Sequence, residues 1–479
     1  MKNRESGSRE KTSDTLLIKP QNMKMHFQKT KSTSVMPIKK IMLLLGLCYG
    51  LLPSLHAQET ISLQKAIEIG LENNFGIQIA RNEAEISSIN RSLGEAGFLP
   101  RVELIGEYST NDDHFRLTDE VTGQKEDIDE KSVYSAGQLS FELPVFQGFY
   151  RITNYKKLQE LEQLGKVQAN LSIENTLVAI ATAYYNIVRY EKRIEVLQNT
   201  VEISQDRREI AETKFEVGTG SEYDLLVTTT DLNVDQTDVI REERMLYNAR
   251  MELIQLLNLS ADSNFQVQTD ITLGAPLELD QLSIVVMQEN RSLQAARLQA
   301  QVAQLEEREI QSQRYPQISL GGAYNISNED LKENMLHEIE RRDGLFYGIT
   351  ARLNIFDGFR TNRQAKIARI NSLSSELVQQ EQEKNVETVL LSYFSDYESA
   401  IDLIALEENN LELARKALDI AFERFRLGNI TPVELRESQR TLLNTETRLI
   451  TAMFEAKIYE IELLRLAGRL LDEYNILPL

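Results

Sequence analysis

The sequence predicts a mainly α-helical chain with a small β part, built around two very long helical hairpins. Three observations lead to this prediction. Residues 149–217 contain no proline and consist largely of Ala, Leu, Glu, Lys, Arg and Gln, the residues that lose least on entering a helix. Residues 222–258 keep a similar composition after a break that contains two glycines. The same order of segments then recurs in the second half of the chain.

The helix predicted over residues 149–217 is too long for the core of a compact domain. At about 1.5 Å per residue it extends roughly 100 Å. It ends at Gly218, and the chain then reverses into the helix predicted over 222–258. The hairpin must therefore project from any compact part of the protein.

The chain contains an internal repeat. Residues 74–81 match residues 290–297 at an offset of 216, and residues 144–148 match residues 354–358 at an offset of 210. We therefore expect an internal duplication. Its predicted parts are a first repeat over 58–259, a linker over 260–280, a second repeat over 281–472 and a short C-terminal tail over 473–479.

Each repeat begins with an amphipathic helix, continues with two strands and ends with the long hairpin. The first helices are predicted over 63–98 and 282–315, where a proline follows each. Alternating apolar and polar residues predict strands over 102–108, 133–146, 318–326 and 345–356, with polar loops over 111–131 and 327–343.

These strands have the length and the two-faced pattern of membrane-spanning β-strands. The alternative is a small soluble sheet with one face on a core. Four strands are too few to close a barrel with an interior, so closure requires several chains. Two, three or four copies are compatible with this count, and three would give twelve strands.

Residues 1–57 are expected to be an N-terminal extension and a signal peptide. Lys39 and Lys40 precede an apolar run over residues 41–55, and Ala57 is a suitable residue before a cleavage site. A lipid anchor on Cys48 is the alternative. Cys48 is the only cysteine of the chain, so the processed protein would have no thiol chemistry.

Composition argues against an enzyme and against a nucleic-acid partner. The net charge of −20 is unsuited to phosphate binding, which needs a basic face. After residue 57 the only histidines are His114 and His337, each in a predicted polar loop. No phosphate-binding glycine loop and no nucleophile arrangement is present, so we expect no catalytic residues, no cofactor and no metal site.

The two hairpins reverse in the same way. Gly218 and Gly428 are suited to the left-handed conformation just past a helix end. Ser221 and Thr431 are predicted N-caps of the returning helices, and Pro432 takes a first helical position.

Asp224 and Glu434 lie three residues after these N-caps, at the spacing of a capping box. Two interpretations remain open for them. They cap helices, or in an oligomer they also repeat around an axis and form a negative ring at the end of a tube.

The element order, the duplication and the recurring Phe-x-x-Gly motif with an acid six residues after the glycine resemble the TolC-like outer-membrane factor family, also called outer membrane efflux proteins. The resemblance covers residues 59–472. It implies a trimer with a long antiparallel α-helical barrel in the periplasm, continued by a transmembrane β-barrel to which each protomer gives four strands.

The resemblance also implies a function, a location and partners. Family members are outer-membrane exit ducts of tripartite efflux or type I secretion systems in Gram-negative cells. Export through them is passive, and a periplasmic adaptor and an inner-membrane transporter open the duct. The expected partners are two further copies of the chain, this adaptor, this transporter and outer-membrane lipid, with no nucleic acid.

The resemblance assigns roles to residues at the hairpin tips. Glu434 and Glu437 match the two acids that ring the periplasmic constriction, and Asp224 matches an acid that helps to latch the closed state. Ile430 stands where some members have an arginine that pairs with this acid, which argues against an ion-paired latch here. The expected adaptor-contacting residues are Phe215, Val217, Gly218, Thr219, Phe425, Leu427, Gly428 and Asn429.

Two other functions are compatible with parts of the sequence. Long acidic helices also occur in secreted periplasmic coiled-coil scaffolds without channel activity. The four paired strands speak against that function. An autonomous porin would need at least about eight strands in one chain.

Overall fold

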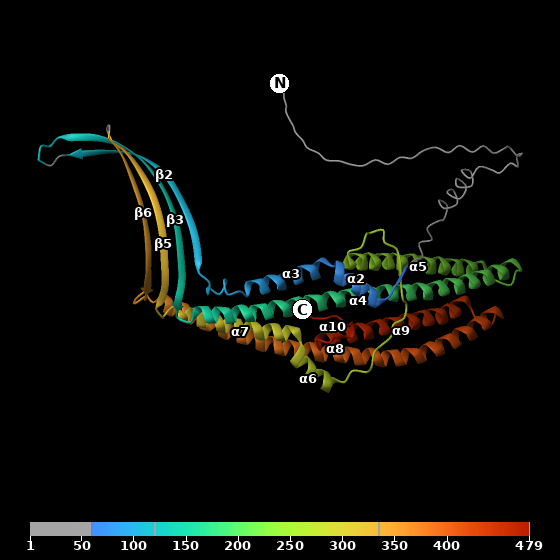
Figure 1. Cartoon of the computed structure of the whole chain (residues 1–479). Helices are drawn as coiled ribbons and strands as arrows, with labels where there is room; N and C mark the ends of the chain where they lie inside the picture. The colour runs from blue at the N-terminus through green and yellow to red at the C-terminus, as the bar shows by residue number, and fades with distance from the viewer. Residues whose placement is uncertain (1–58, 119–120, 334–335, 479) are drawn as a thin grey trace, which may run out of the picture. The chain divides into compact units, whose positions relative to one another are not determined.

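The computed structural model describes residues 59–118, 121–333 and 336–478, so the predicted signal peptide lies outside the described residues. The described chain is mainly α-helical (Figure 1). Its four long helices are α4 (Tyr150–Glu216), α5 (Glu222–Leu257), α8 (Arg360–Arg426) and α9 (Pro432–Leu466). The two long hairpins predicted from the sequence are confirmed. None of the described helices combines the length and the apolar composition needed to cross a membrane.

Each of the predicted first helices is in fact two helices. They are α2 (Leu63–Asn73) and α3 (Phe75–Asn90) in the first half, and α6 (Leu279–Glu289) and α7 (Arg291–Ser312) in the second. Asn74 and Asn290 separate them because each has an extended backbone and caps the following helix with its side chain.

The predicted end of the first helix at residue 98 is wrong. Helix α3 ends at Asn90, where Ser92 begins a series of turns by accepting a hydrogen bond from the Glu95 N–H at 3.1 Å. These turns include Gly97, whose φ of +83° is not helical. Local side-chain bonding thus ends the helix well before Pro100.

Four antiparallel strands form one sheet in the order β2-β3-β5-β6. They are β2 (Arg101–Thr118), β3 (Lys125–Gln147), β5 (Gln317–Glu333) and β6 (Leu336–Arg352). The sheet has the predicted apolar face, because the strand register aligns apolar residues of the four strands in rows across it. One such row is Leu104, Leu139, Tyr324 and Leu345.

The predicted polar loops over 111–131 and 327–343 are wrong, because the strands continue through most of both segments. In the first hairpin, opposite charges face each other across the ladder and offset the polarity of these residues. Asp112 binds Lys131 at 2.8 Å, and Arg116 binds Asp127. The predicted end of the last strand at residue 356 is also wrong, since β6 ends at Arg352, opposite the first residue of β5.

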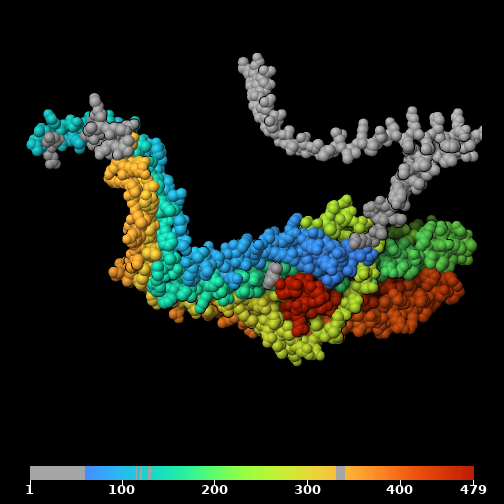
Figure 2. Space-filling view, in the orientation of Figure 1, coloured from blue at the N-terminus to red at the C-terminus, as the bar shows by residue number. Residues whose placement is uncertain are grey.

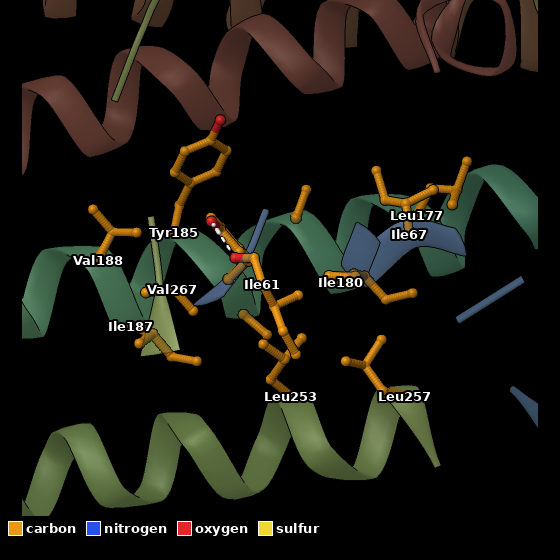
Figure 3. Packing of buried hydrophobic residues seen from close by; sticks show 14 of the residues in the cluster. Ile61, Ile67, Leu177, Ile180, Tyr185, Ile187, Val188, Leu253, Leu257 and Val267 are labelled. Atoms are coloured by element: carbon orange, nitrogen blue, oxygen red, sulfur yellow. Dashed lines mark hydrogen bonds between the residues drawn. The ribbon is translucent and has the colours of Figure 1, made fainter. Parts of the chain in front are cut away.

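The main apolar core lies midway along the hairpins, where the predicted linker contributes to it. Strand β4 (Phe265–Val267) pairs in parallel with β1 (Glu59–Ile61), and neither strand was predicted. Ile61 packs with Leu177 and Ile180 of α4 and with Leu253 of α5 (Figure 3). The segment over 260–280 is therefore a structural part of the core.

The C-terminal segment also belongs to this core. Helix α10 (Leu470–Glu473) buries Leu470 and Leu471, and Tyr474 and Ile476 pack against the same cluster. Figure 2 shows this red segment between the blue N-terminal helices and the yellow-green segment that precedes α7. Burial raises the pKa of the Tyr474 hydroxyl, as expected for a phenol in apolar surroundings.

Each long hairpin starts at an elbow with two left-handed residues. Gly148 and Phe149 have φ of +63° and +70°, and Gly358 and Phe359 have φ of +67° and +62°. A phenylalanine in this conformation is uncommon and strained. Each one stacks edge-to-face on the phenylalanine three residues earlier, with ring centroids 5.4 Å apart. Strand and helix are thus joined in the same way in both halves.

Candidate functional site at the two hairpin tips

The two tips have nearly identical backbone structures. Gly218 and Gly428 have φ of +78° and +77°, as the sequence predicted. The residue after each glycine donates its N–H to a carbonyl of the last helical turn, from Thr219 to Lys214 at 2.9 Å and from Asn429 to Arg424 at 2.8 Å. These bonds satisfy carbonyl groups that the helix end leaves without a partner.

Lys214 links the first tip to the second. Its ammonium group donates a hydrogen bond to the Phe425 carbonyl oxygen at 2.7 Å and lies 4.6 Å from the centre of the Phe425 ring. Phe425 is only 3% exposed and packs with Leu418 and Leu435. The combination of a hydrogen bond and a cation–π contact holds the two tips together.

The acids of the tips differ in their surroundings. Glu434 completes the predicted capping box, because its carboxylate accepts the Thr431 N–H at 2.7 Å. This backbone bond, helped by the Thr431 hydroxyl, lowers the pKa of Glu434, so the group stays charged. Glu437 lies one turn further along α9 and is exposed, whereas Asp224 is half-buried.

At the first tip the Ser221 cap is in place, but the structure has no complete capping box at Asp224 like the one at Glu434. Ser221 caps α5 by accepting the Asp224 N–H at 3.1 Å. A cleft between the tips is lined by Asp224, Lys214, Phe425 and Ile430. Ile430 packs on the apolar cluster around Phe425, so the side chain at this position contributes packing and no charge.

Most of the expected adaptor-contacting residues are exposed. Val217, Gly218, Thr219, Leu427, Gly428 and Asn429 form the exposed surface of the two turns. Phe215 is also exposed, but its counterpart Phe425 is buried inside the chain. The two phenylalanines of the repeated motif therefore have different environments.

A buried polar network behind the tips was not predicted from the sequence. Arg207 of α4 is fully buried and donates to Asp231 of α5 at 2.7 Å and to Gln439 of α9 at 2.8 Å. Arg436 of α9 binds both carboxylate oxygens of Asp235 at 2.7 Å. We call these five residues the inter-hairpin network.

The inter-hairpin network joins both hairpins of one chain by charged groups, of which Arg207 and Asp235 are buried and Asp231 and Arg436 are partly exposed. Burial lowers the pKa of the Arg207 guanidinium. Burial opposes the charge of Arg436 too, but the hydrogen bonds that Arg436 donates to Asp235, together with the negative charges of Asp235 and Asp231, outweigh it and raise the pKa of Arg436. A sequence signal existed: Asp235 follows the buried residues Thr228 and Leu232 at helical spacing, so an acid occupies an inward-facing position.

Comparison with known proteins shows to which family this chain belongs. The sequence profile of the outer membrane efflux proteins matches residues 66–259 and 285–469, which include all four long helices and both tips. The chain belongs to the outer membrane efflux protein family.

Two characterised relatives of this efflux-family chain resemble it along most of their length. Nodulation protein T of Rhizobium leguminosarum bv. trifolii is 21% identical over 83% of this chain and 84% of that protein. Outer membrane protein TolC of Vibrio cholerae is 20% identical over 82% of this chain and 87% of that protein.

A solved structure shows that the efflux-family fold is shared. The outer membrane protein VceC of Vibrio cholerae superimposes with a TM-score of 0.70 at 15% sequence identity. The match covers 85% of this chain and 96% of that one. The long helices and the sheet described above therefore belong to a known fold.

Proposed function

We propose that this protein is the outer-membrane exit duct of a tripartite efflux or type I secretion system. Three copies form the duct, and export through it is passive. One observation carries the proposal: a single chain supplies two equivalent long hairpins and a four-stranded sheet whose outer strands, β2 and β6, each have only one paired edge in the described chain. The free backbone edges of β2 and β6 gain hydrogen-bonding partners when copies of the chain join edge to edge.

The domain organisation follows from this proposal. Residues 1–57 direct the chain to the cell envelope and are removed. An internal duplication gives the repeats 58–259 and 281–472, which the linker 260–280 joins, followed by the tail 473–479. The sheet, with its exposed apolar row, lies among outer-membrane lipid, and the helices lie in the periplasm.

The tip acids form the periplasmic constriction in this proposal. Glu434 and Glu437 are three residues apart and lie on one side of α9, where both are exposed. In a ring of copies they would surround a narrow opening with negative charge, which favours cations over anions. Asp224 lies in the cleft beside them.

The exposed turns are the proposed contact surface for the periplasmic adaptor, which an inner-membrane transporter accompanies. Val217 and Leu427 are the large apolar side chains of this surface, and both are mostly exposed. Gly218, Thr219, Gly428 and Asn429 complete the surface, with Phe215 at its border. Phe425 supports the surface from inside by holding Lys214.

Native mass measured after extraction from isolated outer membranes in mild detergent tests the proposal. Three chains are expected. A soluble monomer or dimer in the periplasmic fraction would favour the coiled-coil scaffold. It would reduce Glu434 to its capping role and leave Asp224 without the proposed one.

A further inference from the structure

The hairpin formed by β2 and β3 is longer than the rest of the sheet. Among the described residues, β3 pairs with β5 up to Glu130, whereas its pairing with β2 continues to Lys125, opposite Thr118. Figure 1 shows this hairpin extending past the ends of β5 and β6. We call residues 113–118 and 125–129 the outer ribbon. Because two strands without a third neighbour are only marginally stable in water, weak contacts across the outer ribbon decide whether its strands stay paired.

Three ion pairs lie on one face of this hairpin, at every second residue. The pairs are Asp112 with Lys131, His114 with Asp129, and Arg116 with Asp127. Each pair joins residues that lie opposite each other in the strand register. The first pair, at 2.8 Å, lies at the base of the outer ribbon, where β5 still pairs with β3. The Nδ1 atom of His114 is hydrogen-bonded to a carboxylate oxygen of Asp129, so this pair connects the supported base to the outermost pair.

The opposite face of the outer ribbon is less favourable for pairing. There the register places Leu117 opposite Glu126, which sets an apolar residue against an acid. Leu117 is 53% exposed, so it gains little from burial. The pairing of the two strands therefore depends strongly on the face that carries the ion pairs.

His114 is the member of this ladder whose charge changes near neutral pH. The hydrogen bond to Asp129 and the negative charge of Asp129 raise the pKa of His114, and the charge of Asp112 adds to this effect. Lys131 opposes it more weakly. The charge of His114, and the stabilisation that it gives to the pair with Asp129, are therefore fully present below the ordinary histidine pKa. Both are lost as pH rises through the raised value.

The other two pairs keep their charges over the same pH range. The bond to Lys131 lowers the pKa of Asp112, and the bond to Arg116 lowers the pKa of Asp127. The charged groups that share a face with His114 are Asp112 and Arg116 on β2 and Asp127, Asp129 and Lys131 on β3. These are three acids and two bases, so loss of the His114 charge turns a neutral face into one with excess negative charge. Repulsion between the remaining acids then favours separation of the strands.

We propose that the outer ribbon is a pH-sensitive element: its strands stay paired while His114 is protonated and separate, starting at the turn, when His114 is neutral. The inference rests on the proposed function for its location, because the end of the sheet far from the helices then lies outside the cell. A strand needs about 10 residues to cross a membrane, and β2 has 18, so the outer ribbon extends beyond the lipid. The pH of the external medium then controls the order of this surface.

Electron paramagnetic resonance of a nitroxide label measures this order. Leu117→Cys in a Cys48→Ser background, which has no other cysteine, places the label on the face opposite the ion pairs. In the full chain extracted in detergent, the ratio of mobile to immobile label should rise about two- to fivefold between mildly acidic and mildly alkaline buffer, the effect of one cross-strand pair. High salt should reduce this rise, because it screens exposed charges.

Two variants of His114 separate its charge from its shape. His114→Lys stays charged in both buffers and should keep the label immobile in alkaline buffer. His114→Gln has no charge in either buffer and should leave the label mobile in both. The proposal is wrong if the unmodified ribbon does not respond to pH, if the response persists in His114→Gln, or if the two variants give equal mobility.

Ser109→Cys provides a matched label position within the wider part of the sheet. Ser109 lies opposite Tyr134, which also pairs with Glu329 of β5, so three strands are joined at this level. A label there should be insensitive to pH. Equal responses at Ser109 and Leu117 would show that the whole sheet loosens, which would overturn the assignment to the outer ribbon.

The label measurement and the native mass fail independently. A single-chain mass with a pH response at Leu117 would reject the duct and support the pH-sensitive ribbon as a property of the chain itself. A mass of three chains without that response would reject only the pH-sensitive ribbon.

Discussion

Asn74 and Asn290 make the same two contacts in the two halves of the chain. Each side-chain oxygen accepts the backbone N–H three residues later, from Ile77 at 3.2 Å and from Leu293 at 3.0 Å. Each side-chain amide donates to a backbone carbonyl near the end of a returning helix, that of Leu256 at 2.8 Å and that of Leu466 at 2.9 Å. One residue thus caps a short helix and fastens it to a long hairpin.

Variants at Asn290 should separate these two contacts. Asn290→Ser keeps the cap but cannot reach Leu466, so we expect a loss of about 1 kcal/mol in the free energy of unfolding. Asn290→Ala loses both contacts and should cost about 2–3 kcal/mol, because Asn290 is buried. The chain has no tryptophan, so circular dichroism is the suitable measure of thermal unfolding. Equal effects of the two variants would contradict the double role.

Neutralising the tip acids should reduce the preference of the channel for cations. Glu434→Gln combined with Glu437→Gln removes both charges, while glutamine still fits the capping box. Planar-bilayer reversal potentials should therefore move toward zero, and thermal stability should fall less than in Glu434→Ala. Glu434→Ala is the control that also loses the cap. Unchanged selectivity in the glutamine variant would rule out the charged ring.

The selectivity that Glu434 contributes should resist acid. The Thr431 N–H lowers the pKa of Glu434, so its charge, and the stability that the charge contributes, are fully present above the ordinary carboxylate pKa. Both are lost only as pH falls through the lowered value. In a Glu437→Gln background, reversal potentials should stay constant through the ordinary range of glutamate titration and decline only below it. A decline centred on that ordinary range would show that the bond to Thr431 does not persist in the channel.

Breaking the inter-hairpin network should be costly. Arg207→Ala leaves Asp231 and Gln439 without their buried partner, and the expected loss is about 3–5 kcal/mol in the free energy of unfolding. The exposed pair of Lys384 and Glu387 is a matched control, since Lys384→Ala should change stability by less than about 0.5 kcal/mol. Thermal unfolding in detergent measures both. Similar effects would mean that the network is open to water.

Glycine-to-alanine changes should distinguish a tip from an elbow. Gly428→Ala places a Cβ in open space at φ +77°, so only the backbone cost of about 1–2 kcal/mol is expected. Gly148→Ala adds a clash with the Ser312 carbonyl oxygen at φ +63°, and it should lower the melting temperature more than Gly428→Ala does. Gly106→Ala, in open space without a positive φ, is the control and should have little effect.

The sequence predicted the features that depend on one segment at a time. Proline-free composition located all four long helices, and glycine with a following N-cap located both tips. The break at Asn74 was missed because it depends on a carbonyl of α5, far away in the chain. The length of the β2–β3 hairpin was missed because the polarity of its residues is offset by partners such as Asp112 and Lys131 across the ladder.

In the candidate site, too, features that depend on one segment could be predicted, and features that depend on contacts between segments could not. The capping role of Glu434 could be predicted from its spacing to Thr431, whereas the burial of Phe425 could not. Phe215 and Phe425 occupy equal positions in a repeated motif, and only contacts between the tips distinguish them. The buried Arg207 required knowledge of which helix faces meet.

The bond from Lys214 to Phe425 and the network around Arg207 both stay within one chain. The two hairpins of a chain are therefore bound to each other near their tips and should move as one unit. In the proposed ring of three copies, neighbouring hairpins can then separate only at the contacts between chains. The periplasmic end would open at these contacts, and the opening would have the symmetry of the number of chains.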